Sequence, residues 1–214
     1  DKLPADRQQL VEQFMSQLVE NMATEDLENK IDVDLYGSAL SLFNDFYEAN
    51  SKEPVIRVFN PELSANGWQS EHTIVQIVVQ DLPFLVDSMK MALNRLSITS
   101  HLLLHTPIKV NRDESGKVVE FVNLKSGEST HQQTVFFIEV DRQAEQSQLD
   151  VLEQEIISVL QEVNVSVDDW QVMQQKLAEC ITEAENANVS NPDKRDKSVE
   201  FLKWVADHNF TLMG

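Results

Sequence analysis

The hydrophobic residues of this chain change their spacing along the sequence, and this change constrains the fold more than any other feature. Near both ends they recur every three or four residues, which is the period of an amphipathic helix. Between about residue 71 and residue 140 they mostly recur at every second residue, which is typical of β-strands. Helices gathered at the two ends of a mostly antiparallel sheet indicate an α+β fold.

Helical stripes predict two helices before the sheet, one within it and three after it. The first two stripes are Leu10, Phe14, Leu18 and Met22, and then, from about Asp34, Leu35, Ala39, Leu42, Phe43, Phe46 and Tyr47. Pro83 is expected to open a helix over 83–96, because proline suits a first helical turn. After a helix over 145–164 come the stripe Trp170, Met173, Leu177, Ile181 and Ala184 and a last helix that begins at Asn191-Pro192-Asp193.

Strands are expected over five short segments, which are 55–59, 71–81, 98–110, 118–124 and 133–140. The residues Asp113-Glu114-Ser115-Gly116 indicate a hairpin turn between the third and fourth of these strands.

The charge of the chain excludes two classes of partner. It carries 36 acidic and 17 basic residues, a formal net charge of −19. A nucleic-acid binder needs a basic face, and an anionic membrane surface also attracts basic segments. The longest apolar run, Val135 to Ile138, has four residues, whereas a membrane-spanning helix needs about 20. We therefore expect neither nucleic acid nor a membrane as a partner.

Cys180 is the only cysteine, which excludes an internal disulfide and fits a reducing, cytoplasmic location. It lies beside Ile181 on an apolar helical stripe, which predicts a buried structural thiol rather than a nucleophile. The chain begins without Met and stops soon after Thr211, where an apolar pattern has just begun. It is therefore expected to be a piece of a longer protein.

His101 and His105 have the spacing of a helical zinc pair, but they lie on an expected strand. At about 3.3 Å per residue their Cα atoms stand about 13 Å apart, too far to share one ion. His72 could approach one of them across the sheet, but no third ligand is evident. No nucleophile elbow, P-loop or dinucleotide fingerprint occurs. The residues therefore predict no catalytic, metal or cofactor site, and they favour a regulatory, binding or scaffolding domain.

One long signature lies in the middle of the chain. Its segments are His72-Thr73-Ile74-Val75-Gln76-Ile77-Val78, Asp81-Leu82-Pro83-Phe84-Leu85-Val86-Asp87-Ser88, Leu93-Asn94-Arg95 and His101-Leu102-Leu103-Leu104-His105. Together with Asp34–Leu40 and Glu200–Trp204, these segments resemble the N-terminal region of the large bacterial NAD-specific glutamate dehydrogenases. The resemblance extends over about residues 32–214.

The resemblance implies a parent enzyme that converts glutamate and NAD to 2-oxoglutarate, ammonia and NADH, with its catalytic and NAD sites outside this chain. It also implies the first ACT-type module, a ferredoxin-like βαββαβ unit of a kind that often binds amino acids at subunit interfaces. We therefore expect an N-terminal helical segment (1–52), an ACT-type domain (53–166) and C-terminal helices that lead to the next domain (167–214). The expected partners are the remainder of the chain, further copies in a homo-oligomer and an amino-acid effector.

Two features depart from the ACT pattern. Phe84 stands where a glycine usually follows the loop proline. After the helix over 145–164 no clear closing strand follows, because Val163–Val167 is short and runs into a helix. Either 133–140 or 55–59 is then expected to fill the edge of the sheet.

An effector is expected at the loop that follows strand 71–81. The predicted site residues are Asp81, Leu82, Pro83, Phe84, Leu85, Asp87 and Ser88. Amides after Pro83 have no intrahelical partner and favour a ligand carboxylate, while Asp81 is near enough in sequence to pair with an ammonium group. In the alternative, Asp81 caps the helix and Phe84 fills the ligand space.

The sheet face opposite helices 83–96 and 145–164 is expected to be too apolar to stay bare. The interface residues predicted on it are His72, Ile74, Leu103, His105 and Phe137. Its cover is either the N-terminal helices or a second subunit or neighbouring domain. The predicted function is a non-catalytic regulatory or assembly region of a glutamate dehydrogenase, and the alternatives are a stand-alone amino-acid sensor and a purely structural oligomerisation module.

Overall fold

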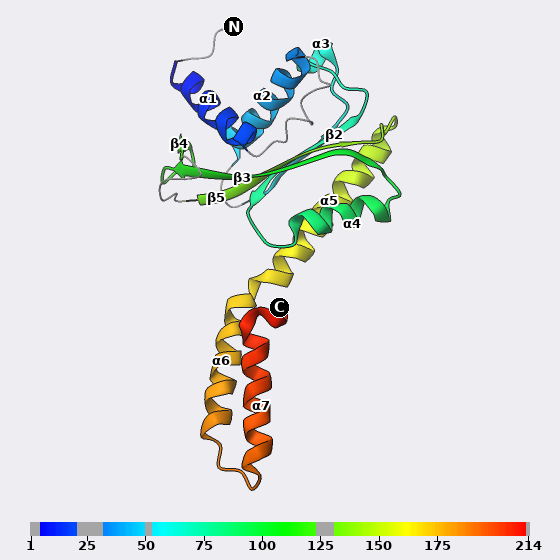
Figure 1. Ribbon diagram of the computed structural model, residues 1–214. Coiled ribbons are helices and arrows are strands. Elements are labelled where there is room, and N and C mark those ends of the chain that lie inside the picture. The colour runs from blue at the N-terminus through cyan, green and yellow to red at the C-terminus, as the bar shows by residue number, and fades with distance from the viewer. Residues whose placement is uncertain (1–4, 21–31, 50–52, 123–130, 213–214) are drawn as a thin grey trace. The chain divides into compact units, whose positions relative to one another are not determined.

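The computed structural model describes residues 5–20, 32–49, 53–122 and 131–212. They form two compact units: residues up to Asp81 with 86–159, and residues 82–85 with 160 onwards. The first unit contains a five-stranded sheet with helices on both faces, and the second contains helices (Figure 1). The expected α+β class is confirmed.

The sheet contains the five strands that the sequence predicts. They are β1 (Val55–Phe59), β2 (Thr73–Gln80), β3 (Ser100–Arg112), β4 (Val118–Phe121) and β5 (His131–Val140). Their order is β1-β2-β5-β3-β4, and each neighbouring pair is antiparallel. Residues 123 and 124, which were expected at the end of the fourth strand, lie outside the described residues, as does Met22.

The edge strand beside β2 comes from the part of the chain that precedes β2. The elements β2, α4 (Leu85–Arg95), β3, β5 and α5 (Gln146–Asp168) follow the βαββα order of a ferredoxin-like unit. The sixth element of that unit would be a strand after the second helix, but α5 is followed by another helix. β1 pairs with β2 at this edge instead. Of the two expected candidates, 55–59 is therefore correct, and 133–140 lies inside the sheet.

Different helices cover the two faces of the sheet. α1 (Ala5–Glu20) and α2 (Asp32–Glu48) lie on one face, and α4 and the part of α5 up to Val159 lie on the other (Figure 1). Ile74 and Phe137 are only 0% and 6% exposed, and they belong to a core cluster with residues of α1 and α2. The N-terminal helices therefore cover this face, as one of the two alternatives proposed.

Leu103 and His105 lie on the opposite face from Phe137, contrary to the prediction. Leu104 is directly opposite Phe137 in the register of β3 and β5, so these two side chains share a face. Leu103 and His105 are each one residue away from Leu104 and point to the other face, which α4 and α5 cover. The pairing is regular from Leu102 onward, and the one irregularity in the register of β3 and β5 lies before it, between Ser100 and Leu102.

The turn between β3 and β4 has the predicted chemistry. Asp113 Oδ1 accepts hydrogen bonds from the amides of Ser115 (2.9 Å) and Lys117 (3.0 Å). Gly116 has a φ of +85°, a left-handed conformation that glycine adopts without steric cost.

A short helix that the sequence analysis does not predict, α3 (Leu63–Asn66), lies between β1 and β2.

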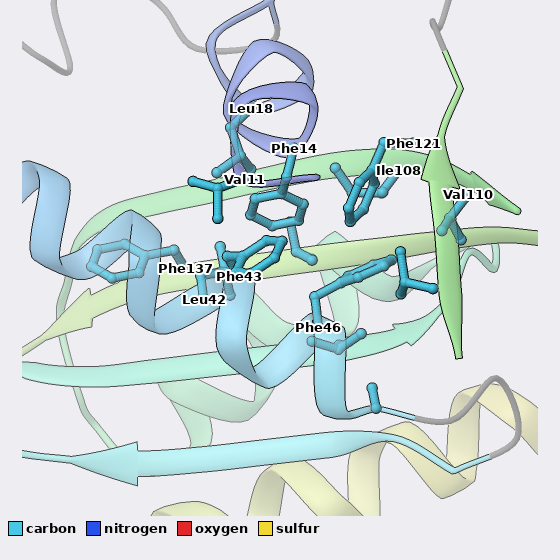
Figure 2. Close-up of a cluster of buried hydrophobic side chains, with 14 of the residues drawn as sticks. Val11, Phe14, Leu18, Leu42, Phe43, Phe46, Ile108, Val110, Phe121 and Phe137 are labelled. Atoms are coloured by element: carbon cyan, nitrogen blue, oxygen red, sulfur yellow. The ribbon is translucent and has the colours of Figure 1, made fainter. Parts of the chain in front are cut away.

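An aromatic cluster forms the core between α1, α2 and the sheet (Figure 2). Phe14 of α1 is fully buried, and its ring centroid lies 5.6 Å from Phe43, 5.5 Å from Phe46 and 5.3 Å from Phe121. These separations lie within the range that aromatic pairs prefer. The cluster joins both N-terminal helices to β4, so α1 and α2 share one core with the sheet.

The second unit contains α6 (Trp170–Asn186), α7 (Pro192–Trp204) and a π-helical turn, Val205–Asn209. Asn191 caps α7 as its position before Pro192 predicts, because its Oδ1 accepts a hydrogen bond from the amide of Lys194. Cys180 is exposed, which corrects the prediction of a buried thiol. The apolar stripe of α6 is at most half-buried, since this helix has no fully buried residue. Within the described residues, every helix is too short or too polar to cross a bilayer.

Candidate functional site

The loop that was predicted to bind an effector begins at Asp81, directly after β2. The Asp81 carboxylate accepts a hydrogen bond from Gln132 Nε2 at 2.7 Å, and the Asp81 amide donates to the carbonyl of Gln132 at 3.3 Å. Asp81 is therefore attached to the neighbouring strand β5. This contact orients its carboxylate independently of the helix that follows in sequence.

Phe84 has a φ of +71°, which is unusual for a residue with a side chain. Glycine adopts this left-handed conformation freely, so the backbone accounts for the glycine that the resemblance places here. The helix begins at Leu85, two residues later than Pro83 predicts. Of the other predicted residues, Leu85 is buried, Leu82 and Ser88 are half-buried, and Pro83 and Asp87 are exposed.

The backbone at Phe84 leads to a prediction about stability. Phe84→Gly is expected to leave the chain more stable than Phe84→Ala by about 1 kcal/mol, because a left-handed residue with a Cβ costs about 1–2 kcal/mol. Both variants lose the same phenyl ring, so their difference isolates the backbone. Urea unfolding of both variants measures it, and equal stabilities would show that the left-handed conformation carries no strain.

Two of the histidines that the sequence singles out come together in the structure. The rings of His72 and His101 stack with their centroids 4.3 Å apart, and His101 Nε2 lies 2.8 Å from Asp141 Oδ1. Among the described residues, no three His, Cys, Asp or Glu side chains are placed to hold one metal ion.

His105 packs against Phe136, with the two ring centroids 4.7 Å apart. Its Nε2 atom is buried and has no hydrogen-bond partner among the described residues. Burial lowers the pKa of His105, and the negative charge of Asp81 only partly opposes this shift. The folded protein therefore favours a neutral imidazole at this position.

The lowered pKa of His105 predicts how stability depends on pH. As the pH falls from about 7.5 to about 5, the unfolded chain gains a proton on His105 before the folded chain does, so stability falls. Most of this loss is expected to disappear in His105→Leu, and urea unfolding across the pH range measures it. Hydrogen bonds lower the pKa values of Asp113 and Asp141, so protonation of these two carboxylates reduces stability only in more acidic solution. Parallel stability curves for the two proteins would contradict the prediction.

Arg112 is a buried residue that the sequence analysis does not identify. Its guanidinium group donates to the carbonyls of Phe46 (3.1 Å), Ala49 (2.6 Å) and Gly116 (2.8 Å), and two nitrogens donate to Gln133 Oε1. Its position two residues after Val110 on the same strand is the one signal that predicts it on the inner face. Arg112 joins the end of α2 to the sheet.

Comparisons with known proteins identify the family of the chain. The profile of the family "Glutamate dehydrogenase, ACT1 domain" matches residues 14–156, which is more than half of the chain. The chain belongs to this family. The resemblance seen in the sequence is therefore confirmed, and the ACT1 match includes α2 and β1 to β5 together with the part of α1 that begins at Phe14.

Proteins named NAD-specific glutamate dehydrogenase are similar to this ACT1 chain. The one from Halomonas elongata is 31% identical over 216 residues, which cover all of this chain and 13% of that protein. The one from Pseudomonas aeruginosa is 34% identical over 203 residues, or 94% of this chain and 12% of that protein. A third, from Mycobacterium tuberculosis, is 26% identical over 144 residues. The chain thus spans about an eighth of the length of the first two relatives.

Proposed function

We propose that this chain is the non-catalytic N-terminal regulatory and assembly region of an NAD-specific glutamate dehydrogenase. The observation that carries the proposal is the ACT1 match, combined with relatives of which the chain covers only 13% and 12%. The parent would oxidise glutamate to 2-oxoglutarate with NAD, and both substrate sites would lie in the remainder of its polypeptide. A cytoplasmic location and the division at about residues 52 and 166 belong to the same proposal.

The purified chain is expected not to form NADH from glutamate and NAD. The sequence contains no dinucleotide fingerprint, which is the feature that would position a nicotinamide cofactor. The measurement is absorbance of NADH with the purified chain, and a full-length glutamate dehydrogenase of this family serves as the positive control. Turnover above the level of a blank would refute the non-catalytic assignment.

Within this region we favour assembly over amino-acid sensing. Phe84 occupies the position where backbone-only access would need glycine, and the Asp81 carboxylate already accepts a hydrogen bond from Gln132. A homo-oligomer of the parent is part of this proposal, and sedimentation of the parent with and without residues 1–214 tests it. Loss of the oligomer on deletion supports an assembly role, and an unchanged oligomer contradicts it.

Thermal unfolding with each free amino acid separates sensing from assembly. A specific ligand at a hundred times its Kd adds about 2.7 kcal/mol of stability, so a bound effector is easily detected. We expect no amino acid to stabilise the chain. A specific increase in stability that Asp81→Ala abolishes would instead support the effector loop at 81–88 and the alternative function of an amino-acid sensor.

A further inference from the structure

Asn66-Gly67 is the only Asn-Gly pair of the sequence, and the proposed function makes no use of it. This pair of residues is prone to spontaneous deamidation, because glycine has no side chain that hinders attack by its backbone nitrogen. In the structure Asn66 is the last residue of α3, and both residues are exposed on the surface of the sheet unit (Figure 1). Water and hydroxide therefore reach the pair.

Deamidation at this pair needs only water as a co-reactant. The Gly67 backbone nitrogen loses its proton and attacks Asn66 Cγ, which forms a C–N bond and releases the side-chain nitrogen of Asn66 as ammonia. Water then opens the resulting succinimide ring at either of its two carbonyls. One opening gives aspartate, and the other gives isoaspartate, in which the main chain is one methylene longer. Both products add a negative charge to a chain that already carries −19.

The closed α3 turn opposes this reaction. The Gly67 amide donates a hydrogen bond to the carbonyl of Leu63 at 3.1 Å, which holds the proton that the reaction must remove. Asn66 Oδ1 accepts a hydrogen bond from the amide of Glu62 at 3.0 Å, so the side chain is fixed toward the start of α3. The attack therefore requires the turn to open. α3 has four residues, none of them buried, and so short a helix has little stability of its own.

The residue that follows the Asn-Gly pair is buried in the core. Trp68 is only 2% exposed, and its ring centroid lies 6.0 Å from that of Phe59 and 6.4 Å from that of Phe137. It also fits tightly against α2, since a Cβ added to Gly37 would lie 2.5 Å from the Trp68 Cβ. Close-packed side chains do not absorb an extra methylene in the adjoining main chain without moving. Isoaspartate at position 66 would therefore displace the indole ring.

We propose that Asn66 is a site of spontaneous deamidation whose rate is set by the opening of α3, and that its isoaspartate product displaces Trp68 from the core. The modification would thereby loosen the packing of α2 on the sheet, because Trp68 belongs to the core cluster that joins them. The inference does not depend on the proposed function.

Mass spectrometry of the whole chain after incubation in mildly alkaline buffer tests whether α3 protects Asn66. Trypsin releases residues 58–90 as one peptide, in which Asn60 is the internal control because it precedes proline, which has no N–H to react. Deamidation of Asn66 is expected to be at least about tenfold slower in the native chain than in guanidinium chloride, since only the open turn reacts. Equal rates would refute the protection by α3, and an unmodified Asn66 in the unfolded chain would refute the site.

Tryptophan fluorescence tests the effect of the product. Trp170→Phe and Trp204→Phe replace the two exposed tryptophans, so Trp68 becomes the only indole group. The aged chain is expected to emit at a longer wavelength than the fresh chain, because its Trp68 contacts water. Freshly purified Asn66→Asp is the matched control, since it adds the same charge without the longer main chain, and it is expected to emit like the fresh chain. No shift in the aged chain, or an equal shift in Asn66→Asp, would overturn the displacement of Trp68 by isoaspartate.

Discussion

Phe14→Ala is expected to lower the free energy of unfolding of the sheet unit by about 4 kcal/mol, as large core truncations do. The side chain is 0% exposed and its ring lies within 5.6 Å of three other phenylalanine rings, measured between centroids. Truncation removes its apolar contacts and leaves a void that the neighbouring rings cannot fill without shifting. Urea unfolding followed by circular dichroism measures the loss.

The control for this variant lies on the same helix. Val19 is 59% exposed, so Val19→Ala is expected to cost less than about 0.5 kcal/mol. If Phe14→Ala costs less than about 2 kcal/mol, the aromatic cluster collapses into the void and contributes less to the fold than its geometry indicates.

Arg112→Met is expected to lower the free energy of unfolding by about 3 kcal/mol. Methionine preserves much of the apolar stem but removes every hydrogen bond of the guanidinium group. The buried carbonyls of Phe46 and Ala49 and the partly buried carbonyl of Gly116 would then be left without this donor. Arg112→Lys is also expected to destabilise the unit, because one ammonium group cannot donate to all the acceptors that the planar guanidinium group reaches.

Arg142→Met is the matched control for the buried arginine. Arg142 is exposed and donates to the carbonyl of Ser70 at 3.0 Å, so its replacement is expected to cost less than about 1 kcal/mol. Equal costs for the two substitutions would show that the hydrogen bonds of Arg112 contribute no more than an exposed contact. The same urea series provides both values.

The strands could be predicted because alternation is a local property of the chain, but their order could not. The local sequence of residues 55–59 is enough to predict a strand, whereas its place beside β2 depends on pairing with residues 74–78, which are distant in sequence. The prediction that Leu103 shares a sheet face with Phe137 is wrong for a related reason. Three leucines follow one another at 102–104, so the alternation alone does not show which of them face inward.

The helices after the sheet show another limit of sequence patterns. The apolar stripe of α6 correctly predicts a helix, but an amphipathic face does not show how much other structure covers it. Cys180 is therefore exposed although it lies next to that stripe. The unusual backbone at Phe84 could be anticipated from the resemblance, because only the expected glycine indicates a positive φ at that position. The effector loop and the interface residues stay predictions.

Because β1 precedes β2 in the chain, the strand at this edge of the sheet is synthesised first. In a βαββαβ unit the strand that occupies this edge is synthesised last, so the sheet is incomplete until the end of the unit. Here every strand has been made once the ribosome reaches Val140, and the part of α5 that covers the sheet follows by Val159. Domains fold as units from the N-terminus during translation. This sheet can therefore close early, while most of a polypeptide as long as those of its relatives is still to be synthesised.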